Sequence, residues 1–445
     1  GIEMRGNRPG WNDALNGLPG LTGSSLNETA ELLDLVRKLR AHAAPAGSMT
    51  VFAELAALLR GISDATTSDA SPLARWHTLN DAREHYLAAV RRGLDGASES
   101  LAFSDLHGVL AYMETVLCNA MRGAHDARSG LYHGYFYYRV TTHRPVINDD
   151  GTPRIHDGRP CVWPVAFERE TLPAYLEPQV RAMKVLEKHD ACRALHRAVQ
   201  RSALYDRGLQ MYVLNASLAR TSRDIGRAGV FPPGWLENQS VWLHMEYKYL
   251  LALLRAGLHT EFFAAIAHAL IPFQPPRRYG RSPLEHSSFI ASSAHPDPSI
   301  HGAGFYARLS GATIEFISMW LQMSGALNMF SVSEDGALRC RLQPILPAAY
   351  FTQKTTTRVI ESNAGARSIT LPKNTCAFVL LGSMLVVYHN PRRRDTFGPR
   401  AVRPQRYELT LCDGVTHALH AEWLGEHYAS QIRSGAITRI DVHLG

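Results

Sequence analysis

Hydrophobic residues return at helical spacing along most of the chain up to residue 323. The segment Ser25-Leu26-Asn27-Glu28 has the form of a capping box, and leucine and valine then recur every three or four positions, which predicts a helix over 26–42. The same periodicity predicts helices over 50–60, 76–93, 101–122, 171–200, 236–256, 260–270 and 302–323. Several of them, Val241–Leu254 most clearly, are apolar on more than one face, which is typical of helices packed between two layers.

Extended segments interrupt this pattern and then replace it. Leu131–Val140 and Cys161–Phe167, separated by the turn sequence Asn148-Asp149-Asp150-Gly151, are predicted as short strands or extended loops. After Gly325, β-rich runs cover 339–342, 355–361, 368–371, 378–389, 407–411 and 437–443. We therefore expect a mainly α fold with a layered helical domain over 1–325 and an antiparallel, sandwich-like β-domain over 326–445.

Composition narrows the class of protein. With 445 residues, of which 45% are hydrophobic and 20% charged, the chain can bury a large core, which excludes disordered and small disulfide-stapled classes. The longest apolar run, Cys376–Tyr388, is shorter than the ~20 residues that cross a bilayer, so no membrane association is expected. Six widely spaced cysteines fit free thiols, and we expect a cytoplasmic protein.

Charge and histidine content add two further expectations. The net charge is +7, but the basic residues are dispersed, and the run Arg392-Arg393-Arg394 lacks interleaved aromatics, which favours a solvated loop over a nucleic-acid site. A mildly positive field suits a small anionic substrate such as phosphate. His417 and His420 lie in a predicted strand without an evident third ligand, so no metal is expected.

Three polar segments could carry chemistry. In the first, Trp11-Asn12-Asp13, an indole beside a carboxylate could stack on a sugar ring and raise the pKa of an acid, although Asp13 could equally hold a turn. In the second, Glu237-Asn238 leads into an apolar helix, with Glu237 and His244 on one helical face. The alternative there is a capped helix with a core histidine.

The third segment runs from Ser287 to Thr313 and is rich in small residues and hydroxyls. It contains His301-Gly302-Ala303-Gly304-Phe305 and Leu309-Ser310-Gly311. Free backbone N–H groups and hydroxyls of this kind can hold a phosphate. Close packing of helices at the glycines is an alternative explanation of the same composition.

Taken together, the three segments resemble, in order and kind, the inverting β-glycoside phosphorylases of glycoside hydrolase family 94. Cellobiose and chitobiose members of that family carry a Trp-Asn-Asp acid loop, a Glu-Asn segment leading to a phosphate-binding histidine, and a Thr-Gly pair. The string Arg8-Pro9-Gly10-Trp11-Asn12-Asp13-Ala14-Leu15-Asn16-Gly17-Leu18-Pro19-Gly20, with His301–Phe305, is most similar to the 1,2-β-oligoglucan phosphorylase branch. The resemblance extends from residue 6 to about 323.

The resemblance implies a role for each matching residue. Asp13 would be the general acid, His244, Ser310 and the Gly311 N–H the phosphate ligands, and Trp11, Asn12, Glu237 and Asn238 the residues around the sugars. Ser310 stands where the cellobiose enzymes have threonine and keeps the hydroxyl. Inorganic phosphate would be a co-substrate with a β-linked gluco-oligosaccharide, and no cofactor would be needed.

The family fold also implies that this chain is the C-terminal part of an enzyme. Family members carry a β-domain, the first barrel helices and a phosphate-binding arginine ahead of the acid loop, and their (α/α)6 barrel has twelve helices, whereas eight are predicted here. We therefore expect a partial barrel. Its apolar faces would be covered by the N-terminal polypeptide of the same enzyme or by self-association.

Two other functions remain open from the sequence. An inverting glycoside hydrolase on the same barrel would need a second carboxylate as base, for which Glu237 is the candidate. A non-catalytic carbohydrate-binding subunit is the third possibility. Release of glucose 1-phosphate, release of free glucose, or binding without turnover would distinguish the three.

Overall fold

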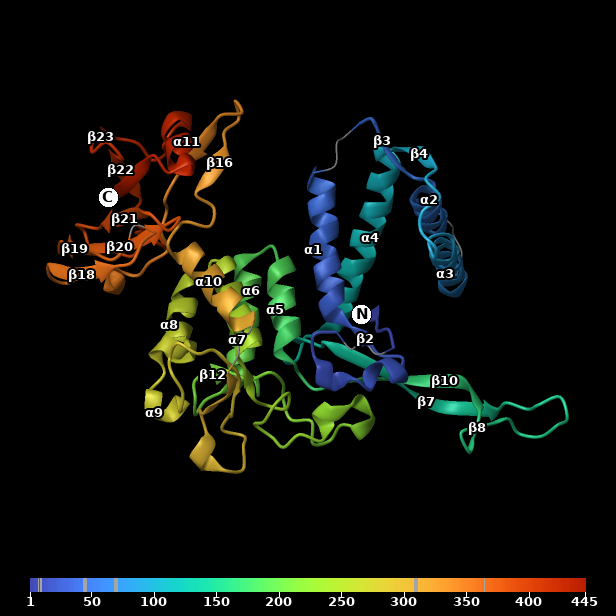
Figure 1. The fold of residues 1–445 in the computed structure, drawn as a ribbon. Helices are drawn as coiled ribbons and strands as arrows, with labels where there is room; N and C mark the ends of the chain where they lie inside the picture. Colours follow the sequence, from blue (N-terminus) through green and yellow to red (C-terminus); the bar gives the residue numbers. More distant parts are fainter. Residues whose placement is uncertain (7, 9, 43–45, 68–70, 308–310, 364) are drawn as a thin grey trace. The chain divides into compact units, whose positions relative to one another are not determined.

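The computed structural model describes every residue except 7, 9, 43–45, 68–70, 308–310 and 364 (Figure 1). The chain forms two compact units that interleave along the sequence. The N-terminal unit comprises residues 1–252, 274–282 and 289–306, and the C-terminal unit comprises residues 253–273, 283–288 and 307–445. This division differs from the single boundary after residue 325 that the sequence suggested, because α8 (His259–Ala269) and α10 (Gly311–Met323) group with the C-terminal strands.

The N-terminal unit contains most of the described helices. They are α1 (Leu26–His42), α2 (Ala53–Thr67), α3 (Pro72–Ala89), α4 (Phe103–Ala124), α5 (Leu176–Val185), α6 (His189–Arg201), α7 (Leu243–Arg255), which continues into the other unit, and the single turn α9 (Pro276–Tyr279). Helix α1 packs against α4 and α5, and α2 packs against α3 and α4 (Figure 1). The helix predicted over 26–42 is confirmed residue for residue.

Three predicted helices differ in the structure. The segment 171–200 forms two helices, α5 and α6, separated at 186–188. The segment 236–242 is a turn and a short strand, because Leu236 and Gln239 adopt left-handed backbone conformations with φ of 48° and 59°. Residues 304–307 form strand β15 (Gly304–Ala307) instead of the start of a helix, and Gly302 before it has φ of 86°.

Two sheets lie largely in the N-terminal unit. The first contains β1 (Ile2–Glu3), β2 (Ser24–Ser25), β7 (Tyr135–Pro145) and β10 (Val162–Thr171), and the second contains β13 (Val241–Trp242), β14 (Ser287–Ile290) and β15. Short pairs are formed by β3 (Ser48–Phe52) with β4 (Ser98–Ala102), β5 (His125–Asp126) with β6 (Leu131–Tyr132), β8 (Ile155–His156) with β9 (Arg159–Pro160), and β11 (Tyr205–Asp206) with β12 (Met211–Tyr212). The strands predicted over 131–140 and 161–167 are confirmed as a long hairpin with a turn at Asn148–Gly151.

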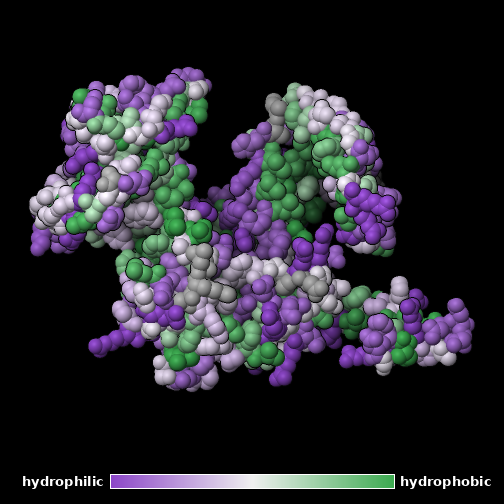
Figure 2. All heavy atoms as spheres, viewed as in Figure 1, coloured by the Kyte–Doolittle hydropathy of each residue, from purple (hydrophilic) through white to green (hydrophobic). Residues whose placement is uncertain are grey.

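The first 124 residues leave hydrophobic side chains exposed. Leu35, Leu39, Leu73, Trp76, Leu87 and Val116 are among them. Figure 2 shows hydrophobic residues gathered over α4 on the face turned to the viewer. Single exposed apolar residues are ordinary on a soluble domain, whereas a contiguous apolar patch can mark a surface that a partner covers.

The C-terminal unit combines three helices with small sheets. Its five-stranded sheet has the order β20 (Thr375–Leu380), β21 (Met384–His389), β24 (Ile437–Leu444), β22 (Pro404–Leu411) and β23 (Thr416–Leu419). The hairpins β16 (Phe330–Val332) with β17 (Leu338–Cys340) and β18 (Thr356–Ile360) with β19 (Arg367–Leu371) precede this sheet in the sequence, and α11 (Glu426–Ser434) packs against β17. All pairs in these sheets are antiparallel except β21 with β24, which is parallel.

The predicted strands of this unit are largely confirmed, and one is divided. The run 378–389 is broken after Leu380 by a turn in which Leu381 has φ of 51°, so it supplies parts of two strands. Residues Met384–Tyr388 are buried on both faces of the sheet, which explains their unbroken apolar sequence. The Tyr388 hydroxyl donates a hydrogen bond to the Ser324 carbonyl at 2.7 Å, so this buried polar group has a partner.

Candidate active site

The loop that carries Asp13 is held in place by its buried apolar residues. Ala14, Leu15 and Leu18 are buried in a cluster with Tyr135 and Ile225, whereas Asp13 is exposed at the start of a short 3-10 helix. The Leu15 N–H donates to the Asn12 carbonyl at 3.0 Å and closes the turn. Apolar residues therefore hold the loop, and the carboxylate of Asp13 lies on its solvent side.

A second loop packs directly on the first. The Gly17 N–H donates to the Ile225 carbonyl at 3.0 Å, and the Arg227 guanidinium donates to the Asp13 carbonyl at 3.2 Å. The Arg227 N–H also reaches the side-chain oxygen of Asn16 at 3.1 Å. Arg227 was not singled out from the sequence, because an arginine between glycine and alanine in a loop is indistinguishable from a solvated one.

Glu237 joins the Glu-Asn segment to the acid loop. Its Oε2 accepts the Ala14 N–H at 3.0 Å, across 223 residues of sequence. Burial raises the pKa of the Glu237 carboxyl, and the charge of Asp13 adds to this rise, while the Ala14 N–H and Arg227 act against it. The site thus pairs an exposed carboxyl group with a partly buried one whose pKa is raised.

The backbone around Glu237 is held in a tight turn. Trp235 and Asn238 exchange backbone hydrogen bonds at 3.2 and 3.1 Å, and Gly234 has φ of 75°. A side chain at Gly234 would meet the backbone of His295 at 2.5 Å, so only glycine fits there. The Asn238 amide is 5% exposed and donates to the Phe231 carbonyl at 2.7 Å. Asn238 therefore stabilises its own loop.

Aromatic contacts bring Trp11 and His244 together. The Trp11 ring meets His244 edge to face, with centroids 5.8 Å apart, and meets Trp242 in the same manner at 6.3 Å. Trp242 stacks in turn on Phe289 at 6.0 Å. His244 lies in the first turn of α7, so the Trp11 indole of the acid loop lies beside the first turn of this helix.

Asn12 is directed into the protein. Its side chain is 1% exposed and donates from Nδ2 to Glu177 Oε2 at 3.1 Å and to the Tyr135 hydroxyl. The sequence placed Asn12 beside a sugar, but the structure uses its amide to anchor the loop. Glu177 and Tyr135 were not singled out from the sequence, because a glutamate in a predicted amphipathic helix reads as a surface residue.

The remaining predicted phosphate ligands are Ser310 and Gly311. Ser310 lies outside the described residues, and Gly311 is the first residue of α10 in the C-terminal unit. Within the described part of the chain, Trp11, Asn12, Asp13, Glu237, Asn238 and His244 all belong to one unit.

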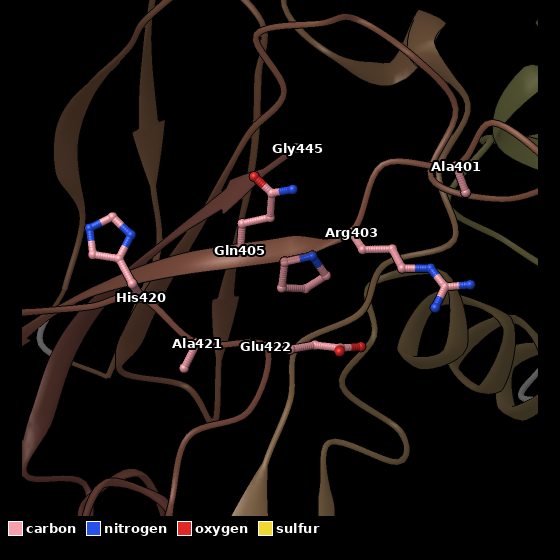
Figure 3. Close-up of a pocket in the computed structure, with 8 residues that line it drawn as sticks. Ala401, Arg403, Gln405, His420, Ala421, Glu422 and Gly445 are labelled. Atoms are coloured by element: carbon pink, nitrogen blue, oxygen red, sulfur yellow. The ribbon is translucent and has the colours of Figure 1, made fainter.

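A separate hollow of about 450 Å³ lies in the C-terminal unit (Figure 3). Arg403, Gln405, His420 and Glu422 line it, and Figure 3 shows the Arg403 and Glu422 side chains on the side of the hollow away from His420. His417, three positions earlier, packs on Tyr428. The two histidines therefore do not act as a pair.

No family model and no curated protein matches the chain. Among the residues that the structure describes, no group of three or more His, Cys, Asp or Glu side chains could hold a metal ion. No described helix has the length and hydropathy needed to cross a bilayer.

Proposed function

We propose that this chain catalyses inverting phosphorolysis of β-linked gluco-oligosaccharides and that the linkage is β-1,2. The enzyme would be similar to the members of glycoside hydrolase family 94. The observation that carries the proposal is the acid loop itself. Asp13 is exposed beside Trp11, the Trp11 ring rests on His244, and Glu237 binds the backbone one residue further on. A proton donor, an aromatic surface and a potential anion ligand thus come from segments more than 200 residues apart.

In the proposed mechanism, inorganic phosphate attacks the anomeric carbon from the α face and the glycosidic bond breaks. Asp13 donates its proton to the departing oxygen, so that the products are α-glucose 1-phosphate and a shortened oligosaccharide. His244, with Ser310 and the Gly311 N–H, would bind the phosphate. Inorganic phosphate is a co-substrate, and the mechanism requires no cofactor.

The environment of Glu237 favours phosphorolysis over hydrolysis. A hydrolytic base must be free to take a proton from water on the face opposite the acid. Glu237 Oε2 already accepts the Ala14 N–H, so this oxygen is engaged in holding the acid loop. A carboxyl group in this position supports the acid loop, whereas a phosphate nucleophile carries its own charge and needs no base.

The proposal includes the architecture implied by the resemblance. The helices of residues 1–325 would belong to a partial (α/α)6 barrel, and residues 326–445 would form the sandwich-like domain of a cytoplasmic enzyme. The exposed hydrophobic residues of the first 124 positions support a covering partner. We propose as that partner the N-terminal polypeptide of the same enzyme or a second copy of this chain.

The test measures glucose 1-phosphate and free glucose released by the full-length protein from β-1,2-gluco-oligosaccharides, with and without phosphate. We expect phosphate-dependent glucose 1-phosphate, and a loss of about 10²–10⁴-fold in Asp13→Asn. His244→Ala is expected to raise the KM for phosphate more than that for the oligosaccharide. Asp149→Asn, which changes an exposed aspartate in the hairpin turn, is the matched control.

Each alternative function has its own result in this assay. Free glucose formed without phosphate would establish a hydrolase. Oligosaccharide binding without turnover would establish a binding subunit. Normal phosphorolysis by Asp13→Asn would refute the assignment of the acid.

A further inference from the structure

A buried carboxylate lies behind the acid loop. Glu177, on α5, is 1% exposed, and three side-chain donors converge on its Oε2. They are Tyr135 Oη at 2.7 Å, Asn27 Nδ2 at 3.0 Å and Asn12 Nδ2 at 3.1 Å. One oxygen atom therefore joins α5, the first turn of α1, the start of β7 and the acid loop.

The other oxygen of Glu177 has a charged partner. Arg181, one turn later on α5, donates from Nη2 to Glu177 Oε1 at 3.2 Å and from Nη1 to Glu31 at 2.5 Å. Burial raises the pKa of the Glu177 carboxyl, while Arg181 and the Tyr135 hydroxyl act against this rise. A carboxylate buried so completely is tolerated only when donors surround it.

The hydrogen-bond roles around Asn12 are fixed. Because the Tyr135 O–H donates to Glu177, its oxygen is left to accept from Asn12 Nδ2. Both protons of the Asn12 amide are thus used, one on Tyr135 and one on Glu177. Asn12 is the residue immediately before Asp13, so the anchored side chain of Asn12 determines the position and direction of Asp13.

We propose that Glu177 is the positioning residue of the acid loop: it holds Asn12 so that Asp13 points outward toward the substrate. This inference rests on the proposed function of Asp13. Glu177 does not touch substrate, and it acts through Asn12, both directly and by way of the Tyr135 hydroxyl. Its bonds to Asn27 and Arg181 satisfy the buried carboxylate and do not reach the loop.

The test compares Glu177→Gln with two controls. Glutamine has the same shape but cannot accept all three donors, so we expect kcat to fall about 10²-fold, as for a displacement of ~1 Å, with the KM for phosphate unchanged. Asn27→Ala removes another donor to Glu177, and Glu31→Gln another partner of Arg181. Both controls should keep kcat within about twofold of wild type.

A double-mutant cycle identifies the path of the effect. If Glu177 acts through Asn12, the loss of kcat in Glu177→Gln combined with Asn12→Ala should equal that of one single variant. Additive losses would overturn the proposal. Should Glu177→Gln fail to fold, Tyr135→Phe keeps the ring and removes only the hydroxyl, and we expect a smaller loss of kcat, also without a change in the KM for phosphate.

Hydrogen exchange separates this inference from the proposed function. In Glu177→Gln we expect faster exchange of the Leu15 amide, which donates to the Asn12 carbonyl, and unchanged exchange of amides in α4. This result does not depend on any activity. A wild-type protein without phosphorolysis would refute the proposed function, whereas an unchanged Leu15 exchange rate would refute the positioning role.

Discussion

Gly17→Ala should disturb the acid loop without changing any polar side chain. Gly17 has φ of −86°, so alanine is allowed there by its backbone conformation. A methyl group at this position would, however, lie 1.9 Å from the Asp224 carbonyl oxygen and 2.8 Å from the Ile225 carbonyl carbon. Both atoms belong to the backbone, so neither can be moved by a change of rotamer.

The size of the effect follows from this distance. An ordinary contact needs at least 3.4 Å, so the two loops must separate by about 1.5 Å (3.4 minus 1.9). Overpacking of this kind costs about 1–3 kcal/mol of unfolding free energy, and part of it would come from the lost bond between the Gly17 N–H and the Ile225 carbonyl. A shift of more than 1 Å next to an acid can lower the rate by about 10²-fold.

The assay pairs urea unfolding with the initial rate of phosphorolysis. Gly20→Ala is the matched control, because Gly20 lies in the same segment and a methyl group there would meet nothing within 4 Å. We expect Gly20→Ala to resemble wild type and Gly17→Ala to lose both stability and rate. If the two variants behave alike, the close approach of the loops is not needed, and the packing argument is refuted.

Two further predictions concern the C-terminal unit. Burial opposes ionisation of Asp441, but hydrogen bonds from Arg439 and His389 outweigh burial and lower its pKa to about 2. The stabilisation, about 2 kcal/mol, is present above pH 4 and lost as pH falls through 2, so Asp441→Asn should be less stable at pH 7 but not at pH 2, as measured by chemical denaturation. An equal deficit at both pH values would contradict this. Trp423 carries guanidinium groups of Arg339 and Arg341 at 4.1 and 4.4 Å from its ring centroid. Trp423→Leu should therefore cost about 1–3 kcal/mol in urea unfolding and Trp423→Phe clearly less, whereas equal losses would show that the ring faces contribute nothing.

The sequence predicted those helices and strands that are determined by residues close together in the chain. The helix at 26–42 follows from its capping sequence and its leucine spacing, and the hairpin at 131–171 follows from strand-forming runs on either side of a turn. The failures at 236–242 and 302–307 lie where Leu236, Gln239 and Tyr306 take left-handed conformations. Such conformations in residues other than glycine are imposed by tertiary contacts, and the sequence carries no signal for them.

The candidate site shows the same limit at longer range. The sequence, through its resemblance to a family, could single out Trp11, Asp13 and His244 as residue types suited to the chemistry. It could not reveal that Glu237 supports the Ala14 backbone, because periodicity says nothing about contacts 223 residues apart. Glu177 was missed because its helix looks amphipathic and its burial arises only from partners distant in sequence.

The interleaving of the two units governs how the protein can be divided. The chain passes between them five times, after residues 252, 273, 282, 288 and 306. A gene cut at any single position therefore leaves at least one product with a unit that lacks part of its own chain. Truncation at residue 325 would separate α8 and α10 from the strands with which they group. Domain exchange with another protein should accordingly succeed only when all segments of a unit are transferred together.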